Sequence, residues 1–367
     1  MQTINDRVRS LIDRLGLTQR EFAERVGLDN SKMSKSFAGV RRFSSLDAAR
    51  IAEVGGVTVD WLLTGADSEL GLAARVSDDS STERAAAEAQ RLSDTRSNLA
   101  FLGYPQTWQP VEAAMAGGYE ARGAALAEAA IRRLAEHDLA LVGADLPDVV
   151  EVAFGADVAI KDLGSGFDGL SVITDDARLI LVSQSTIPWR QRFTIAHELG
   201  HLLAGDDQGL HFDADIFDRE HGRLDSERGA NAFATSFLMP EVLLREAAGS
   251  RGFTPDSFAG LAARLKVSPT ALAFRLQRLR LIDAYAAASF GEYTAHHVAR
   301  LSGSVAELAS GIATAQSERP PGLLIRDALT AYSAGDTTIV PYAELLGLDA
   351  EELRLSLESG DQPDAPS

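Results

Sequence analysis

Hydrophobic and polar residues follow a helical period along most of this chain, and short β-type runs appear near its centre. In the first 65 residues, Thr18 stands three residues before Glu21, which is the spacing of an N-terminal capping box. Gly27 then allows a tight turn between two short helices. One helix is predicted at 4–15, and two short helices are predicted between Thr18 and Phe37, on either side of the turn at Gly27. Two more are predicted at 45–54 and 59–63. Together they predict a small five-helix bundle.

The remainder of the chain is also predicted to be mainly helical, with one small sheet. Residues 66–82 lose the periodicity and are expected to form a linker. Runs separated by Gly and Asp predict strands near 158–161, 169–173 and 179–182. Helices are expected at 83–103, 119–136, 192–205, from 225 onward, within 255–283 and in several pieces of 284–358. The tail at 359–367 is expected to be disordered.

Composition narrows the class of protein. A length of 367 residues suggests two or three domains. Because the chain has no cysteine, disulfides and thiolate metal sites are excluded, and any metal must be held by histidine and carboxylate. The N-terminus has no apolar signal segment, and no later apolar stretch is long enough to span a membrane. We therefore expect a cytoplasmic protein with no membrane partner.

The net charge of -18 is unevenly distributed. Residues 1–65 contain ten Lys and Arg against eight Asp and Glu, a balance of +2, which leaves -20 for the remainder. This asymmetry predicts a small module that faces DNA, attached to an acidic body that DNA would repel.

The N-terminal bundle resembles the phage-repressor family of helix-turn-helix proteins (Cro/CI, XRE type) across nearly all of residues 4–65. Small Ala23 permits close helix crossing, and the second short helix is polar on the face that would enter a major groove. The residues that the resemblance places at DNA bases or phosphates are Gln19, Asn30, Ser31, Lys32, Ser34, Lys35, Arg41 and Arg42. A homodimer would strengthen such binding. The alternative is a bundle kept for protein contacts, which the small positive charge also allows.

The segment "RFTIAHELGHLLAG" places two histidines four residues apart around a glutamate. On a helix, residues at this spacing lie about 40° apart, so His197 and His201 can share an ion. Glu198 lies about 100° around from His197, close to the metal without binding it, where it can act as a general base. The alternative is an accidental match on a buried helix, but unpartnered buried histidines would be costly.

A third ligand is available downstream, in "DSERGANAFATSFLMP". Glu227 can complete the three-ligand set of a catalytic zinc site, and Asn231 can support a ligating imidazole through its far nitrogen. Two histidines and one carboxylate would also suit Mn²⁺ or Fe²⁺. The alternative for Glu227 is a first-turn acid that the helix dipole favours.

These two segments resemble the ImmA/IrrE family of metallopeptidases, from roughly 124 to 283. Gly229 replaces a usual acid and Phe237 a usual leucine, but neither change removes a proposed ligand or base. The resemblance implies a gluzincin-like zinc peptidase in which His197, His201 and Glu227 bind the metal and Glu198 is catalytic. Known members cleave phage-type repressors. An oxyanion-stabilising residue is also expected, with His211, His221 and several tyrosines as candidates, whereas His137, His296 and His297 are expected to be structural or exposed.

The interpretation is a mainly α (α+β) regulator that combines DNA binding with cleavage of a repressor-type protein. Cleavage in trans is favoured, then cleavage guided to operators, then cleavage of its own linker. The alternative from another class is a transcription factor that uses a silent peptidase fold as a metal or ligand sensor. The expected parts are the helix-turn-helix domain at 1–65, a linker and connecting helix at 66–105, the peptidase at 106–283, a helical appendage at 284–358 and the tail. The helix-turn-helix-like pattern within 255–283 is expected to pack beside the peptidase core.

Overall fold

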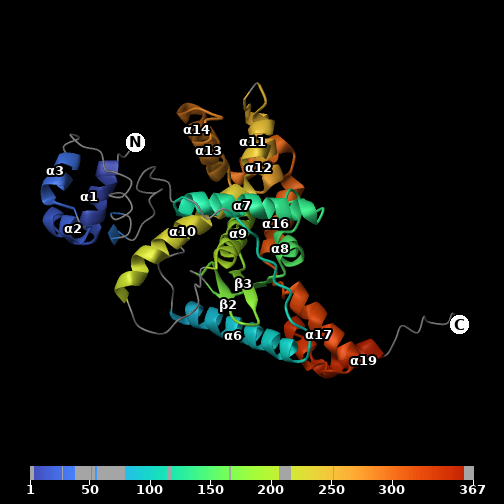
Figure 1. The fold of residues 1–367 in the computed structure, drawn as a ribbon. Coiled ribbons are helices and arrows are strands. Elements are labelled where there is room, and N and C mark those ends of the chain that lie inside the picture. Colours follow the sequence, from blue (N-terminus) through green and yellow to red (C-terminus); the bar gives the residue numbers. More distant parts are fainter. Residues whose placement is uncertain are drawn as a thin grey trace. The chain divides into compact units, whose positions relative to one another are not determined.

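The structure, a computed structural model, describes residues 4–26, 28–37, 51, 54–55, 79–113, 117–164, 167–205, 216–250 and 252–358. They belong to two compact units, the first extending to Thr82 and the second starting at Glu83 (Figure 1). The chain is mainly helical with a small three-stranded sheet, which confirms the predicted α+β class. None of the described helices is long and apolar enough to cross a membrane.

The first unit contains three consecutive helices at the predicted positions: α1 (Ile4–Arg14), α2 (Gln19–Arg25) and α3 (Asn30–Phe37). The capping box forms as expected, since Thr18 accepts from the Glu21 backbone and the Glu21 carboxylate accepts from the Thr18 backbone. Phe22, Ala23 and Met33 are fully buried among the three helices. The predicted helices at 45–54 and 59–63 lie largely outside the described residues.

The second unit is built on a sheet with the strand order β1-β3-β2. Strand β1 (Asp157–Lys161) pairs in parallel with β3 (Arg178–Ser183), and β2 (Gly169–Ile173) pairs with β3 in the antiparallel direction. These strands match the three predicted runs to within one residue at each end. Because side chains alternate along each strand, Val158 and Ile180 lie on one face of the sheet, and Asp157 and Leu179 lie on the other.

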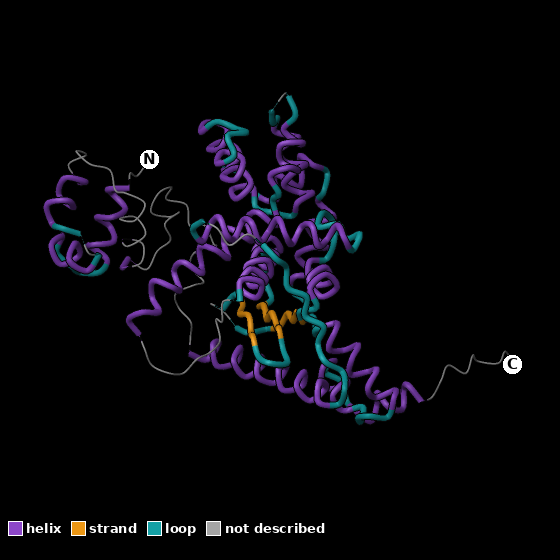
Figure 2. The backbone as a smooth tube through the Cα atoms, in the orientation of Figure 1, coloured by secondary structure: helices purple, strands orange, loops and turns teal. Residues whose placement is uncertain are grey.

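Helices cover both faces of the sheet (Figure 2). On one face, Val158 and Ile180 share a core with α7, α8, α9 and α10. On the other face, Asp157 points toward α6 and α17. The helices of this unit are α6 (Asp79–Phe101), α7 (Tyr119–Glu136), α8 (Leu146–Phe154), α9 (Pro188–Ala204), α10 (Ile216–Leu238), α11 (Glu241–Ala248), α12 (Pro255–Leu265), α13 (Pro269–Arg278), α14 (Ala284–Gly291), α15 (Ala295–Ser302), α16 (Val305–Ala315), α17 (Gly322–Ala334), α18 (Val340–Leu346) and α19 (Ala350–Glu358).

The helix-turn-helix-like pair α12 and α13 packs into the same core as the metal-site helices. Leu261 and Leu265 of α12 and Leu272 and Leu276 of α13 are all buried there. The exposed Arg278 of α13 pairs with Glu120 of α7. This packing agrees with the expectation that the segment lies beside the core.

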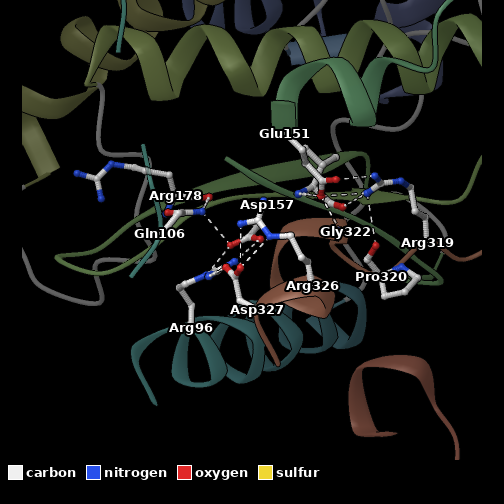
Figure 3. Close-up of polar contacts among 11 residues, drawn as sticks. Arg96, Gln106, Glu151, Asp157, Arg178, Arg319, Pro320, Gly322, Arg326 and Asp327 are labelled. Atoms are coloured by element: carbon white, nitrogen blue, oxygen red, sulfur yellow. Dashed lines mark hydrogen bonds and ion pairs between the residues drawn. The ribbon is translucent and has the colours of Figure 1, made fainter. Parts of the chain in front are cut away.

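The C-terminal helices are joined to the sheet by its outer strand. Ile160 on β1 and Arg319 exchange two backbone hydrogen bonds of 2.8 and 2.9 Å, which covers the free edge of β1. The guanidinium of Arg319 then binds the carboxylates of Glu151 and Asp148 on α8, at 2.7 and 2.6 Å (Figure 3).

A buried ion cluster, which we call the α6 cluster, ties three distant segments together (Figure 3). Arg96 of α6 donates two hydrogen bonds to Asp157 at 2.9 and 2.8 Å and one to Asp327 of α17 at 2.6 Å. Gln106 donates a further hydrogen bond to Asp157 at 2.8 Å. Arg96 is 1% exposed, so the guanidinium and both carboxylates satisfy one another away from solvent.

Three expectations need correction. Helix α8 was not predicted, because its valines favour strands, although its buried residues recur at helical spacing. The helix expected from 225 onward begins earlier, at Ile216, because Arg, Glu and Leu favour a helix more than Gly222 opposes it. The linker expected at 66–82 is already helical from Asp79, and the rest of it lies outside the described residues.

Candidate metal centre

The proposed metal-binding residues come from two helices that approach closely. Gly200 of α9 faces α10, and a side chain there would lie 3.1 Å from the Phe233 ring and 3.2 Å from the Ala230 Cα. Gly200 thus allows a small distance between the two helix axes. As a consequence Glu227, on α10, reaches the histidines of α9.

The side chains of His197, His201 and Glu227 converge on one point. The Nε2 atoms of the two histidines are 3.1 Å apart. The Glu227 carboxylate oxygens lie 3.3 Å from His197 Nε2 and 3.7 Å from His201 Nε2. Two ligands bound at about 2.1 Å in a tetrahedral site would be about 3.4 Å apart. The three ligand atoms therefore fit a single ion of zinc size, and they form the one such group found among the described residues.

Burial and charge distinguish the two histidines. His201 is 1% exposed, whereas His197 is 15% exposed and lies nearer the surface. Burial lowers the pKa of His197, but the hydrogen bond to Glu227 and the charges of Glu198 and Glu227 outweigh it, so its pKa is raised overall. The site attracts positive charge before any ion binds.

Glu198 lies beside this group and is not one of its three ligands. It is 7% exposed, and burial raises its pKa, while the charges of the neighbouring histidines act in the opposite direction. A carboxylate with a raised pKa is better able to accept and return a proton near neutral pH.

Helix α10 also supports both imidazoles. The side chain of Asn231 lies near enough to His197 to favour the charged form of that imidazole and so to raise its pKa. The hydroxyl of Ser226 lies 3.2 Å from His201 Nδ1, a contact that the sequence analysis missed. Its only sequence signal is its place next to Glu227.

One of the two departures from the family pattern lies at a packing contact. Phe237 is fully buried and stacks on Phe233 with ring centroids 5.3 Å apart. At Gly229 a side chain would meet only Tyr119, at ordinary contact distances of 3.6 and 3.9 Å, so packing does not require glycine there. The close contact between α7 and α10 depends instead on Gly123, where a side chain would lie 2.1 Å from the Gly229 carbonyl oxygen.

The expected DNA-facing residues of α3 share one exposed surface. Asn30, Ser31, Lys32, Ser34 and Lys35 are exposed, while Met33 and Ser36 between them are buried. Gln19, at the start of α2, donates hydrogen bonds to Asn30 at 3.2 Å and to Ser34 at 2.8 Å, which joins the two helices on this surface. Arg41 and Arg42 lie outside the described residues.

The other histidines that the structure describes are not part of the group of metal ligands. His137 is the C-cap of α7, and His297 packs edge-on against Tyr293 with ring centroids 4.5 Å apart. Neither these two nor His296 belongs to the His197 group. His211 and the side chain of His221 lie outside the described residues.

Comparison with known proteins identifies two domains. Residues 8–62 match the helix-turn-helix family, and residues 153–277 match the IrrE N-terminal-like domain family. The chain is 36% identical over 160 residues to the radiation response metalloprotease IrrE of Deinococcus radiodurans, a region that covers 41% of this chain and 46% of that protein. It is 34% identical over 157 residues to the protein of the same name from Deinococcus deserti, covering 41% of this chain and 54% of that one.

The chain thus spans about half the length of the curated relatives it matches. The match to the IrrE N-terminal-like domain contains all three convergent ligands and Glu198, and the helix-turn-helix match contains α2 and α3. A metallopeptidase family implies a metal cofactor, and the His-His-Glu group is suited to hold one. The chain therefore carries an N-terminal helix-turn-helix domain of the XRE type and an IrrE-like domain of the metallopeptidase family.

Proposed function

We propose that this protein is a cytoplasmic transcriptional regulator whose second unit is a zinc-dependent endopeptidase acting on a repressor-type protein. The observation that carries the proposal is the convergence of His197, His201 and Glu227, at 3.1 to 3.7 Å, beside the buried carboxylate of Glu198. A structural metal site has no need of a nearby carboxylate that stays unbound, whereas hydrolysis does.

The proposed mechanism assigns each side chain one task. A Zn²⁺ ion held by the three ligands would act as a Lewis acid that polarises a water molecule and the scissile carbonyl. Glu198 takes a proton from the attacking water and gives it to the departing amine nitrogen. Burial of Glu198, which raises its pKa, supports this return of the proton.

The outer edge of β2, which no described strand covers, suggests how a substrate would be held. Strand β2 is an edge strand, and the bonds from Ser183 to Asp168 and from Thr174 to Ala177 identify which of its residues face β3. By alternation, Gly169, Ser171 and Ile173 direct their backbone groups outward. A side chain at Gly169 would lie 2.7 Å from Thr194 Cγ2, so this strand lies directly against α9. An extended peptide paired to this edge would lie alongside Glu198.

The helix-turn-helix unit is proposed to bind DNA through the exposed polar face of α3, with Lys32 and Lys35 next to phosphates. Joined to a peptidase, it would serve a protease that acts in trans, or it would guide the enzyme to operators where a repressor is bound. Cleavage in trans is the arrangement we favour.

The test uses the purified full chain loaded with Zn²⁺ and an XRE-type repressor encoded beside its gene. Glu198→Gln should retain about one metal ion per chain and lose at least about 100-fold in cleavage rate, because general-base catalysis contributes that much. His201→Ala should lose both the metal and cleavage, and both variants should still bind DNA. Glu246→Gln, an exposed acid of α11, is the control.

Two results would overturn the proposal. Cleavage that survives Glu198→Gln would exclude the assigned mechanism. Metal binding and DNA binding without cleavage of any such repressor, together with DNA binding that responds to metal, would favour the sensor interpretation.

A further inference from the structure

Helix α10 contacts His201 through the hydroxyl of Ser226. We infer that Ser226 is a positioning residue for metal binding, holding the His201 imidazole in the tautomer that presents Nε2 to the ion. The inference rests on the proposed metal site and concerns a side chain that neither the sequence motif nor the family resemblance assigns.

The two ring nitrogens of His201 face different partners. His201 Nε2 faces the point where the ligands converge, at 3.1 Å from His197 Nε2. The other ring nitrogen, Nδ1, lies 3.2 Å from the Ser226 hydroxyl on the opposite side of the imidazole. A neutral imidazole carries one proton, so a proton on Nδ1 leaves the Nε2 lone pair available to a metal.

The contact between His201 and Ser226 is buried. His201 is 1% exposed and Ser226 is 8% exposed, so water has little access to this contact. A buried Nδ1–H needs an acceptor, since leaving it unpaired would cost about 1–3 kcal/mol. The hydroxyl oxygen of Ser226 can accept this hydrogen bond, and it thereby favours the metal-binding tautomer.

Ser226 lies on the same helix as Glu227 and Asn231. Ser226, Glu227 and Asn231 lie at about 0°, 100° and 140° around the helix, so one side of it carries a metal ligand and the supports of both imidazoles. Glu227 faces both Nε2 atoms, Ser226 contacts His201, and Asn231 favours the charged form of His197 and so raises its pKa. An ion bound at this site would depend on α10 for one ligand, Glu227, and also for the support of the imidazoles on α9.

Ser226 differs from the partners that ligating histidines usually have. Carboxylates and backbone carbonyls are common in that position, and a carboxylate makes the imidazole more basic. A neutral hydroxyl orients the ring and adds no further negative charge to a site that already contains Glu198 and Glu227. Ser226 is therefore expected to set the orientation and tautomer of His201 more than its basicity.

The experiment measures Zn²⁺ affinity of the full chain by competition with a chelator, without reference to any substrate. Ser226→Ala should weaken Zn²⁺ binding about 10- to 100-fold, the range typical when the partner of a ligating histidine is removed. Ser226→Thr keeps the hydroxyl and should restore most of the affinity. Ser236→Ala removes an equally buried serine, ten residues further along α10 and bonded to Arg275, and should leave affinity unchanged.

The tautomer is read separately, from the ¹⁵N chemical shifts of His201 in the metal-free protein. The parent chain should carry its proton on Nδ1, and Ser226→Ala should shift the population toward Nε2–H. If Ser226→Ala binds Zn²⁺ within about twofold of the parent and keeps the same tautomer, the inference is wrong. If the parent chain itself binds no Zn²⁺ through His201, the proposed function fails instead, so the two failures can be distinguished.

Discussion

Two groups of ionisable side chains lie in the same unit and differ in burial and in how their charges are compensated. In the α6 cluster, Arg96 uses three hydrogen bonds to bind two carboxylates, and Gln106 satisfies a further carboxylate position. In the metal group, the imidazole Nε2 atoms of His197 and His201 and the carboxylate of Glu227 bring three lone-pair donors together. In the α6 cluster the positive and negative charges pair with one another. In the metal group the lone pairs are complementary to a cation that the chain itself does not supply.

The difference separates a structural cluster from a functional one. Buried opposite charges that pair with good geometry hold segments in place, and removing one partner strands the other. A group of metal ligands behaves differently, because all of its members offer lone pairs. Their convergence stabilises the fold only when a cation binds. Each of the following measurements tests one side of this contrast.

The largest effect is expected from Arg96→Met. The substitution leaves Asp157 and Asp327 buried without their common cation, which typically costs about 3–5 kcal/mol. Unfolding by urea at neutral pH, followed by circular dichroism, measures the loss. Arg354→Met, which removes an exposed pair with Glu351 on α19, is the control and should change stability by less than about 1 kcal/mol.

The loss in Arg96→Met should also depend on pH. Burial raises the pKa of Asp157 to about 6, although Arg96 opposes this, so the folded chain takes up a proton before the unfolded chain does as the pH falls. The contribution of this carboxyl to stability is present near pH 4 and is lost as the pH rises past 6. Without Arg96 the pKa rises further, so the variant should be less destabilised at pH 5 than at pH 8. Equal losses at both values would contradict the assignment.

A smaller effect is expected from removing the metal. An ion that binds the folded chain at 100 times its dissociation constant stabilises it by about 2.7 kcal/mol, so chelation should lower the free energy of unfolding by that amount. The α6 cluster shares no side chain with the metal group, so the difference between Arg96→Met and the parent should be the same with and without metal, within about 0.5 kcal/mol. A larger change would show that the two clusters are coupled.

The smallest effect on stability is expected from Glu227→Gln in the metal-free chain. Glu227 is 41% exposed, so the substitution should change the free energy of unfolding by less than about 1 kcal/mol. It should also lower the pKa of His197, since Glu227 raises that pKa by hydrogen bond and by charge. Thermal unfolding and the NMR titration of His197 measure the two effects. A loss of several kcal/mol would mean that Glu227 is a structural acid.

Much of the candidate site could be predicted because it is local in sequence. His197, Glu198 and His201 lie within five residues, and helical geometry alone brings them to one region of α9. The capping box at Thr18 and the polar face of α3 are local in the same sense, and the structure shows them as expected. The supporting role of Ser226 could not be predicted, since serine beside an acid is common and only the position of α9 gives it meaning.

Local features of this protein can therefore be inferred from sequence alone: the spacing of the proposed metal ligands, the caps, the three strands and the uneven charge. Each depends on neighbours a few residues apart, where backbone geometry dictates which side chains meet. The other contacts arise only in the folded chain. Folding brought Arg96 to Asp157 and Asp327, 61 and 231 residues away, covered β1 with Arg319, and used Gly200 and Gly123 to bring helices into contact. Such contacts depend on how helices and strands pack, which no short-range pattern encodes.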